Sequence, residues 1–114
     1  MSESNGNRRL TAADIFAAQD LRTETVDVPE WGGSIAVRTM TAKEAEDFGE
    51  TPKKDSLLRL VELCTVGPEG ERLFTHEDLA RLAEKSWVVI LRVHLKAAEL
   101  NGLTPDAQAI IKNA

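Results

Sequence analysis

The sequence has 114 residues, of which 42% are hydrophobic and 29% charged, as in an ordinary globular domain. Its net charge of −5, without a clustered basic stripe, argues against nucleic acid as a partner. No apolar run approaches the roughly 20 residues of a membrane span, and the polar start lacks a hydrophobic secretory segment, so we expect neither membrane insertion nor export.

A polar leader opens the chain. Residues 1–9 are too polar to offset the entropy of ordering, so we predict a flexible leader followed by a single domain over residues 10–114. Within Leu10–Leu21, Thr11 and Asp14 have the spacing of a capping box. This stretch therefore predicts a short helix or turn.

Two alternating segments predict an antiparallel β-hairpin. Thr23–Val28 and Ser34–Met40 have the period-two pattern of strands, and the Pro-Glu-Trp-Gly-Gly segment between them suits a turn. A lone hairpin is marginally stable, so we expect helices to cover one face. Trp31, at the tip, is either an anchor for a partner or a plug that folds back over Val28 and Ile35.

Capping residues also mark the next helix. Thr41 and Glu44 predict a helix to about Phe48, followed by a polar linker over residues 49–54. Its acidic side chains lack the ligand order of a calcium loop, so we expect them to form a solvated face. These residues are Glu44, Glu46, Asp47 and Glu50.

A leucine-rich helix is predicted over Ser56–Val66. Only Arg59 and Glu62 interrupt its apolar surface, so we expect it to be mostly enclosed. The single cysteine, Cys64, lies in this helix and is expected to act as a small buried apolar residue. With no second cysteine and no nearby histidine, it does not form a zinc-site pattern.

A turn and a short helix come next. Gly67–Glu71 predicts a turn, after which Leu73 and Phe74 are expected to enter the core. Thr75 begins a short helix that we expect to end near Ala83.

The longest predicted helix is Ser86–Leu100. Its polar residues recur on one side, and Val89 falls within this polar stripe. Asn101–Gly102 predicts its end, and Pro105–Lys112 a terminal helix. The expected fold is mainly α with one β-hairpin (α+β), with about five helices packed on a two-stranded antiparallel hairpin.

The sequence predicts no catalytic, metal or cofactor site, so we do not expect an enzyme. No serine, cysteine or threonine lies in a recognised nucleophile motif. His76 is expected at a solvated surface, and His94 is expected to be a hydrogen-bonded, partly buried residue of the long helix.

Protein binding is the remaining class of function. Two helices with narrow polar stripes offer more apolar surface than one thin core easily covers, unless they simply pack on each other and on the hairpin. We hypothesise that partner helices dock beside the long helix, and a homo-oligomer is a further possibility. The candidate contact residues are Trp31, Trp87, Val89 and Arg92.

The order of motifs resembles the tail assembly chaperone family of long-tailed (siphovirus-type) bacteriophages. The similar segments cover nearly the whole chain after the leader. They are Val28–Gly32, Arg38, Leu57–Val66, Leu73-Phe74, Lys85-Ser86 and Leu100–Leu103. Trp87 departs from this pattern, since a smaller residue is expected there.

The resemblance implies a non-enzymatic role in the cytoplasm of the bacterial host and absence from the mature virion. Such a protein coats the tape measure protein, keeps it soluble and helps to recruit the tail tube (major tail) protein through a longer, frameshifted form. The alternative, from composition alone, is an oligomeric structural adaptor or connector subunit retained in the virion tail.

Overall fold

The computed structural model describes residues 8–104, so most of the predicted leader and all of the predicted terminal helix lie outside it. No helix in this range has the length and apolar character needed to cross a membrane. The elements, with short 3₁₀ helices labelled η, are α1 (Ala12–Ala17), β1 (Thr23–Val28), η2 (Pro29–Trp31), β2 (Gly33–Arg38), α2 (Ala42–Gly49), η3 (Lys53–Asp55), α3 (Ser56–Cys64), β3 (Thr65–Val66), η4 (His76–Asp78), α4 (Leu79–Leu82) and α5 (Trp87–Leu100).

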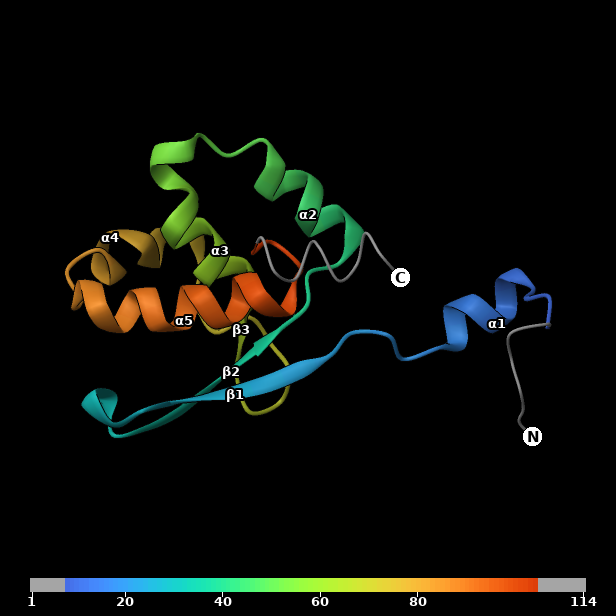
Figure 1. Ribbon diagram of the computed structural model, residues 1–114, viewed down its shortest axis with the longest axis horizontal. Coiled ribbons are helices and arrows are strands. Elements are labelled where there is room, and N and C mark those ends of the chain that lie inside the picture. The colour runs from blue at the N-terminus through green and yellow to red at the C-terminus, as the bar shows by residue number, and fades with distance from the viewer. Residues whose placement is uncertain (1–7, 105–114) are drawn as a thin grey trace.

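The body of the molecule has a helical layer and a small antiparallel sheet, which confirms the α+β class. Helices α3 and α5 pack against each other, and α5 lies along β1 and β2 (Figure 1). The main core includes Val26, Val28, Ile35 and Val37 of the sheet, Val61 of α3, and Val89, Ile90 and Val93 of α5. The expectation that helices cover one face of the hairpin is therefore confirmed.

A third strand corrects the predicted two-stranded sheet. The leucine-rich helix ends at Cys64, and the last two residues of its predicted range are extended. In the sheet, Thr65 pairs with Val37 and Val66 with Ala36. β-branched residues lose rotamer freedom in a helix and fit a sheet well. The Thr65 hydroxyl also donates to the Val61 carbonyl at 2.8 Å, which satisfies a carbonyl at the helix end.

Local signals at the hairpin and the helix starts are confirmed. In the hairpin, Val26 pairs with Ile35 and Thr23 with Arg38. Gly32 has a φ of 87°, which allows the chain to leave η2 and enter β2. Capping boxes form at Thr11 in α1 and at Thr41 in α2.

Two predicted positions are wrong. Val89 does not lie on a polar stripe: it is 3% exposed and packs in the main core. The reason is that α5 is covered on two sides, by α3 and by the hairpin. Of the pair expected in the core, Phe74 packs against it, whereas Leu73 is exposed.

Helix α1 stands apart from this body. Figure 1 shows it beyond the open end of the hairpin, joined to β1 by an extended segment, and none of its residues is buried. The radius of gyration is 16.2 Å, against about 13 Å for a compact domain of this length. The molecule is therefore a compact body with a projecting N-terminal segment.

Candidate protein-binding surface

Helix α5 presents a row of apolar side chains to solvent. Val88 and Leu95 are 62% and 51% exposed, and Leu91 between them is half-buried. The spacing of these three residues places them on one helix face. Trp87, the first residue of the helix, is 63% exposed. We call Trp87, Val88, Leu91 and Leu95 the α5 seam.

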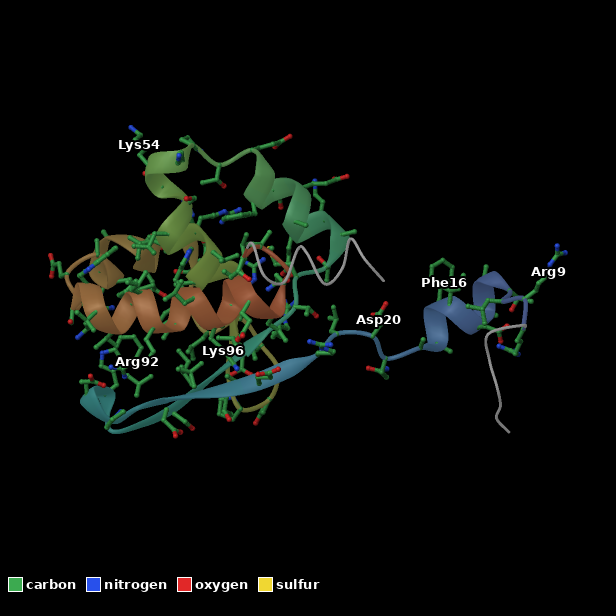
Figure 2. The ribbon with its side chains drawn as sticks, in the orientation of Figure 1. Arg9, Phe16, Asp20, Lys54, Arg92 and Lys96 are labelled. Atoms are coloured by element: carbon green, nitrogen blue, oxygen red, sulfur yellow. The ribbon has the colours of Figure 1, made fainter. Side chains whose placement is uncertain are left out.

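The other faces of α5 fix the orientation of the seam. Val93 and Ala97 are fully buried. On the hairpin side, Arg92 donates two hydrogen bonds to the Glu30 carboxylate at 2.7 and 2.8 Å. Lys96 forms an ion pair with Glu24 at 2.7 Å. Figure 2 shows Arg92 and Lys96 pointing from α5 toward the hairpin.

Both ion pairs lower the pKa of the acidic partner. The Arg92 hydrogen bonds lower the pKa of Glu30 to about 2, and the hydrogen bond from Lys96 lowers that of Glu24. Both carboxylates are therefore charged at neutral pH. The hairpin is held against α5 by Glu30 at its tip and by Glu24 near its open end, as well as by the core beneath it.

The predicted contact residues have different surroundings. Trp31 is 37% exposed and follows Glu30 at the hairpin tip, so the Glu30–Arg92 pair links its turn to α5. Trp87 belongs to the seam, and Arg92 is held by Glu30. Val89 is buried and offers no surface to a partner in this conformation.

Sequence reasoning missed most of the seam as an exposed surface. The helical spacing of Val88, Leu91 and Leu95 places them on the apolar side of the long helix, but the sequence did not single them out as exposed. Periodicity identifies an apolar face of a helix without telling whether another element covers it. Only the packing of α5 decides that this face is open.

Glu44 departs from the solvated acidic face predicted for this helix, because it lies in a buried charge cluster, whereas Glu46 and Glu50 are exposed as predicted. Glu44 accepts hydrogen bonds from Arg38 at 3.0 and 2.9 Å, from Arg72 at 2.8 Å and from the Thr41 amide at 3.0 Å. Its side chain is 12% exposed. Burial by itself raises the pKa of this carboxyl, but the hydrogen bonds from Arg38, Arg72 and Thr41 outweigh burial and lower the pKa to about 2.

Glu62 extends the cluster along α3. It is buried, contacts Arg59 at 2.7 Å and Arg72 at 3.9 Å, and lies 3.2 Å from Nδ1 of His76. His76 is exposed, as predicted, but it has this acidic neighbour. Arg72 joins the two carboxylates, so the cluster connects α2, α3 and the loop that follows β3. We assign it a structural role, because the partners of Glu44 hold its carboxylate in the charged state.

The two other reactive side chains occupy interior positions, as predicted. Burial raises the pKa of the Cys64 thiol to about 11, so it is protonated at neutral pH. Burial also lowers the pKa of His94, whose Nδ1 lies 3.3 Å from the Leu57 carbonyl. Within residues 8–104, no group of three or more His, Cys, Asp or Glu residues is placed to hold a metal ion.

A separate hollow of about 700 Å³ lies among α2, η3, α3 and α4. We call it the α2–α4 groove. Its lining is of mixed character, with three leucines (Leu57, Leu58 and Leu79), three acidic residues (Asp47, Glu50 and Asp55), and Lys54, Arg59 and His76. It is of a size that holds side chains of a docked segment.

Comparison with solved structures finds the same fold in the tail assembly chaperone of bacteriophage HK97. The match has a TM-score of 0.58 and 21% sequence identity, and it covers 77% of this chain and 90% of that one. The resemblance in sequence motifs is thus supported by a likeness in fold. No protein-family model matches the chain, and a search of curated proteins finds no match.

Proposed function

We propose that this chain is a non-enzymatic phage tail assembly chaperone that binds the tape measure protein and keeps it soluble. The observation that carries the proposal is the shared fold with the HK97 tail assembly chaperone over 77% of the chain. Recruitment of tail tube subunits, through a longer frameshifted form, belongs to the same proposal. The site of action is the cytoplasm of the bacterial host.

The α5 seam is the surface that we assign to the tape measure protein. An amphipathic helix binds a hydrophobic surface through apolar residues spaced three and four apart, and Val88, Leu91 and Leu95 have the matching spacing. Trp87 adds an aromatic side chain, a type enriched among residues that dominate binding energy. The net charge of −5 opposes aggregation through this exposed apolar surface.

Trp31 and Arg92 border this surface in the proposal. Arg92 keeps the hairpin tip against α5 through Glu30, and Trp31 lies beside that contact. We therefore retain Trp31 and Trp87 as direct contacts and give Arg92 a positioning role. Val89 is no longer proposed as a contact, because it is part of the core.

Co-expression with the tape measure protein tests the proposal. The wild-type chain should increase the soluble fraction of that protein and co-purify with it. The double variant Val88→Asp, Leu95→Asp should weaken binding by about tenfold or more, because two exposed apolar contacts become charged. Both positions are exposed, so the fold should persist, and circular dichroism checks this. Phe16→Ser is the matched control, since Phe16 is exposed on α1, away from the seam.

Two results would count against this function. If the tape measure protein stays equally soluble without this chain, the proposed chaperone role is wrong. If the double variant binds as well as the wild type, the assignment of the seam as the binding surface is wrong. Mass spectrometry of purified virions separates the chaperone from a connector subunit retained in the tail, because the chaperone should be absent from the particles. The nucleotide sequence beyond the Ala114 codon shows whether a frameshifted extension is encoded.

A further inference from the structure

The α2–α4 groove lies on the opposite side of α5 from the hairpin. Figure 1 shows α2, α3 and α4 above α5 and the two long strands below it. The groove has a volume of about 700 Å³, and none of the four seam residues lines it. It is therefore a second surface of the body, separate from the surface assigned to the proposed function.

Three leucines form the apolar part of the groove. Leu57, Leu58 and Leu79 pack against the main core, but each is only partly buried and also lines the groove. Ala80, which is exposed, lines it with a small side chain and leaves space beside them. A hollow of this size with partly covered leucines suits an apolar side chain of a docked segment.

Some of the charged side chains in the groove already have partners. Arg59 pairs with the buried carboxylate of Glu62 at 2.7 Å, and His76 lies 3.2 Å from the same carboxylate. Asp47 forms an ion pair with Lys43 at 3.5 Å. These side chains are satisfied within the molecule and leave little charge for a ligand.

Glu50 and Asp55 have no such partner. Both are exposed, and among residues 8–104 neither forms an ion pair. The remaining cation of the groove, Lys54, points outward from the molecule (Figure 2). The charge that the groove offers to a ligand is therefore negative.

The end of α2 adds to this negative charge. Helix α2 ends at Gly49, and Glu50 is the cap residue that follows it. The C-terminal end of a helix carries a partial negative charge and is stabilised by a nearby cation. No basic residue lies in the last turn of α2, which contains Glu46 and Asp47 instead. A cation supplied by a ligand would stabilise this helix end.

We propose that the α2–α4 groove binds a segment of a partner protein in which a lysine or arginine lies beside an apolar side chain. The apolar side chain contacts the three leucines, and the cation pairs with Glu50 or Asp55 near the end of α2. The net charge of −5 attracts such a segment at long range. Because the groove and the seam share no residue, one chain can hold two partner segments at once.

Nuclear magnetic resonance with synthetic peptides tests this contact. The probe is a short peptide with adjacent leucines flanked by lysines. In spectra of the isotope-labelled full-length chain, it should shift the amide signals of groove residues such as Thr51, Leu58 and Ala80 more than those of the seam. A peptide with glutamates for the lysines should bind about tenfold more weakly or worse, and so should one with serines for the leucines.

Reversing the charge of the groove gives the decisive result. Glu50→Lys with Asp55→Lys should weaken binding of the lysine peptide about tenfold or more, and this chain should prefer the glutamate peptide. Asp20→Lys with Glu69→Lys is the matched control, since it changes the net charge equally at exposed residues outside the groove. The control should keep the preference for lysine. Ala80→Gln should weaken binding without any change of charge, because a longer side chain fills the groove.

Several results would overturn the proposal. Equal binding of the lysine and glutamate peptides removes the charge recognition, and signal shifts confined to the seam remove the groove as the site. Groove signals that change with protein concentration in the absence of peptide show that a second copy occupies it. Groove signals that shift when residues 105–114 are deleted show that the chain occupies its own groove.

The outcome is independent of the proposed function, because no tape measure protein is used. Failure of tape measure binding leaves the groove assignment intact if the peptides bind as expected. Failure of the peptides leaves the chaperone role intact if the tape measure protein is kept soluble.

Discussion

At the scale of single residues, Glu44 shows how a charged side chain can be accommodated in the protein interior. Its place at the third position of α2, after Thr41, was predicted as part of a helix cap, and the cap forms. The sequence did not predict the two arginines that meet its carboxylate, because Arg38 and Arg72 come from a strand and a distant loop. Ion pairing by both arginines offsets the cost of burying the charge.

Glu44→Gln is expected to lower the free energy of unfolding by about 3 kcal/mol at pH 7, because it leaves Arg38 and Arg72 facing a neutral amide. Glutamine still suits the helix cap, so the loss reports on the charge. Urea unfolding measures it. Glu46→Gln, an exposed change in the same helix, is the control and should stay within about 0.5 kcal/mol of the wild type. Equal effects of the two changes would contradict a buried charge cluster.

The same carboxylate makes stability depend on acid pH. Its pKa in the folded chain is about 2, below the ordinary value of 4.5. Its stabilisation is thus fully present above pH 4.5 and is lost as the pH falls from there toward 2. The difference in unfolding free energy between the wild type and Glu44→Gln should shrink over this range. A difference that remains constant down to pH 2 would show that the charge of Glu44 is not its source.

At the scale of elements, the hairpin depends on one left-handed residue. Gly32, at a φ of 87°, ends η2, whereas the neighbouring Gly33 lies in β2 without a positive φ. A Cβ at either position meets no atom within 4 Å, so the two glycines differ in backbone conformation and not in space.

Gly32→Ala is therefore expected to lower the free energy of unfolding by about 1 kcal/mol, the strain of an L-residue in the left-handed region. Gly33→Ala is the matched control and should change stability by less than about 0.5 kcal/mol. Thermal unfolding followed by circular dichroism compares them. If Gly33→Ala proved the more damaging, the assigned turn conformation would be incorrect.

At the scale of the whole molecule, the projecting N-terminal segment that precedes Arg22, here called the arm, and the body are separate in their contribution to stability. The residues of α1 are not buried and the core clusters include none of them, so the body should not need the arm to fold. A chain that begins at Arg22 should unfold within about 2 °C of the full-length chain, measured by differential scanning fluorimetry at concentrations where both are monomeric. A large loss of thermal stability would place the arm against its own body.

The sequence by itself determined the features that depend on neighbours three or four residues apart. Capping residues placed the starts of α1 and α2, alternation placed β1 and β2, and the Asn101–Gly102 stop ended α5. The order of motifs also indicated a fold that comparison with a solved structure supports. These signals are local because a helix turn and a strand repeat are short.

Only the tertiary structure decided which apolar and charged faces are covered. Val89 became core and Val88 became surface although they are adjacent, because α3 and the hairpin occupy two sides of α5 and leave the third open. The strand at Thr65–Val66 and the burial of Glu44 arose in the same way, from partners distant along the chain. Burial depends on which elements meet, and spacing within one element does not specify its neighbours.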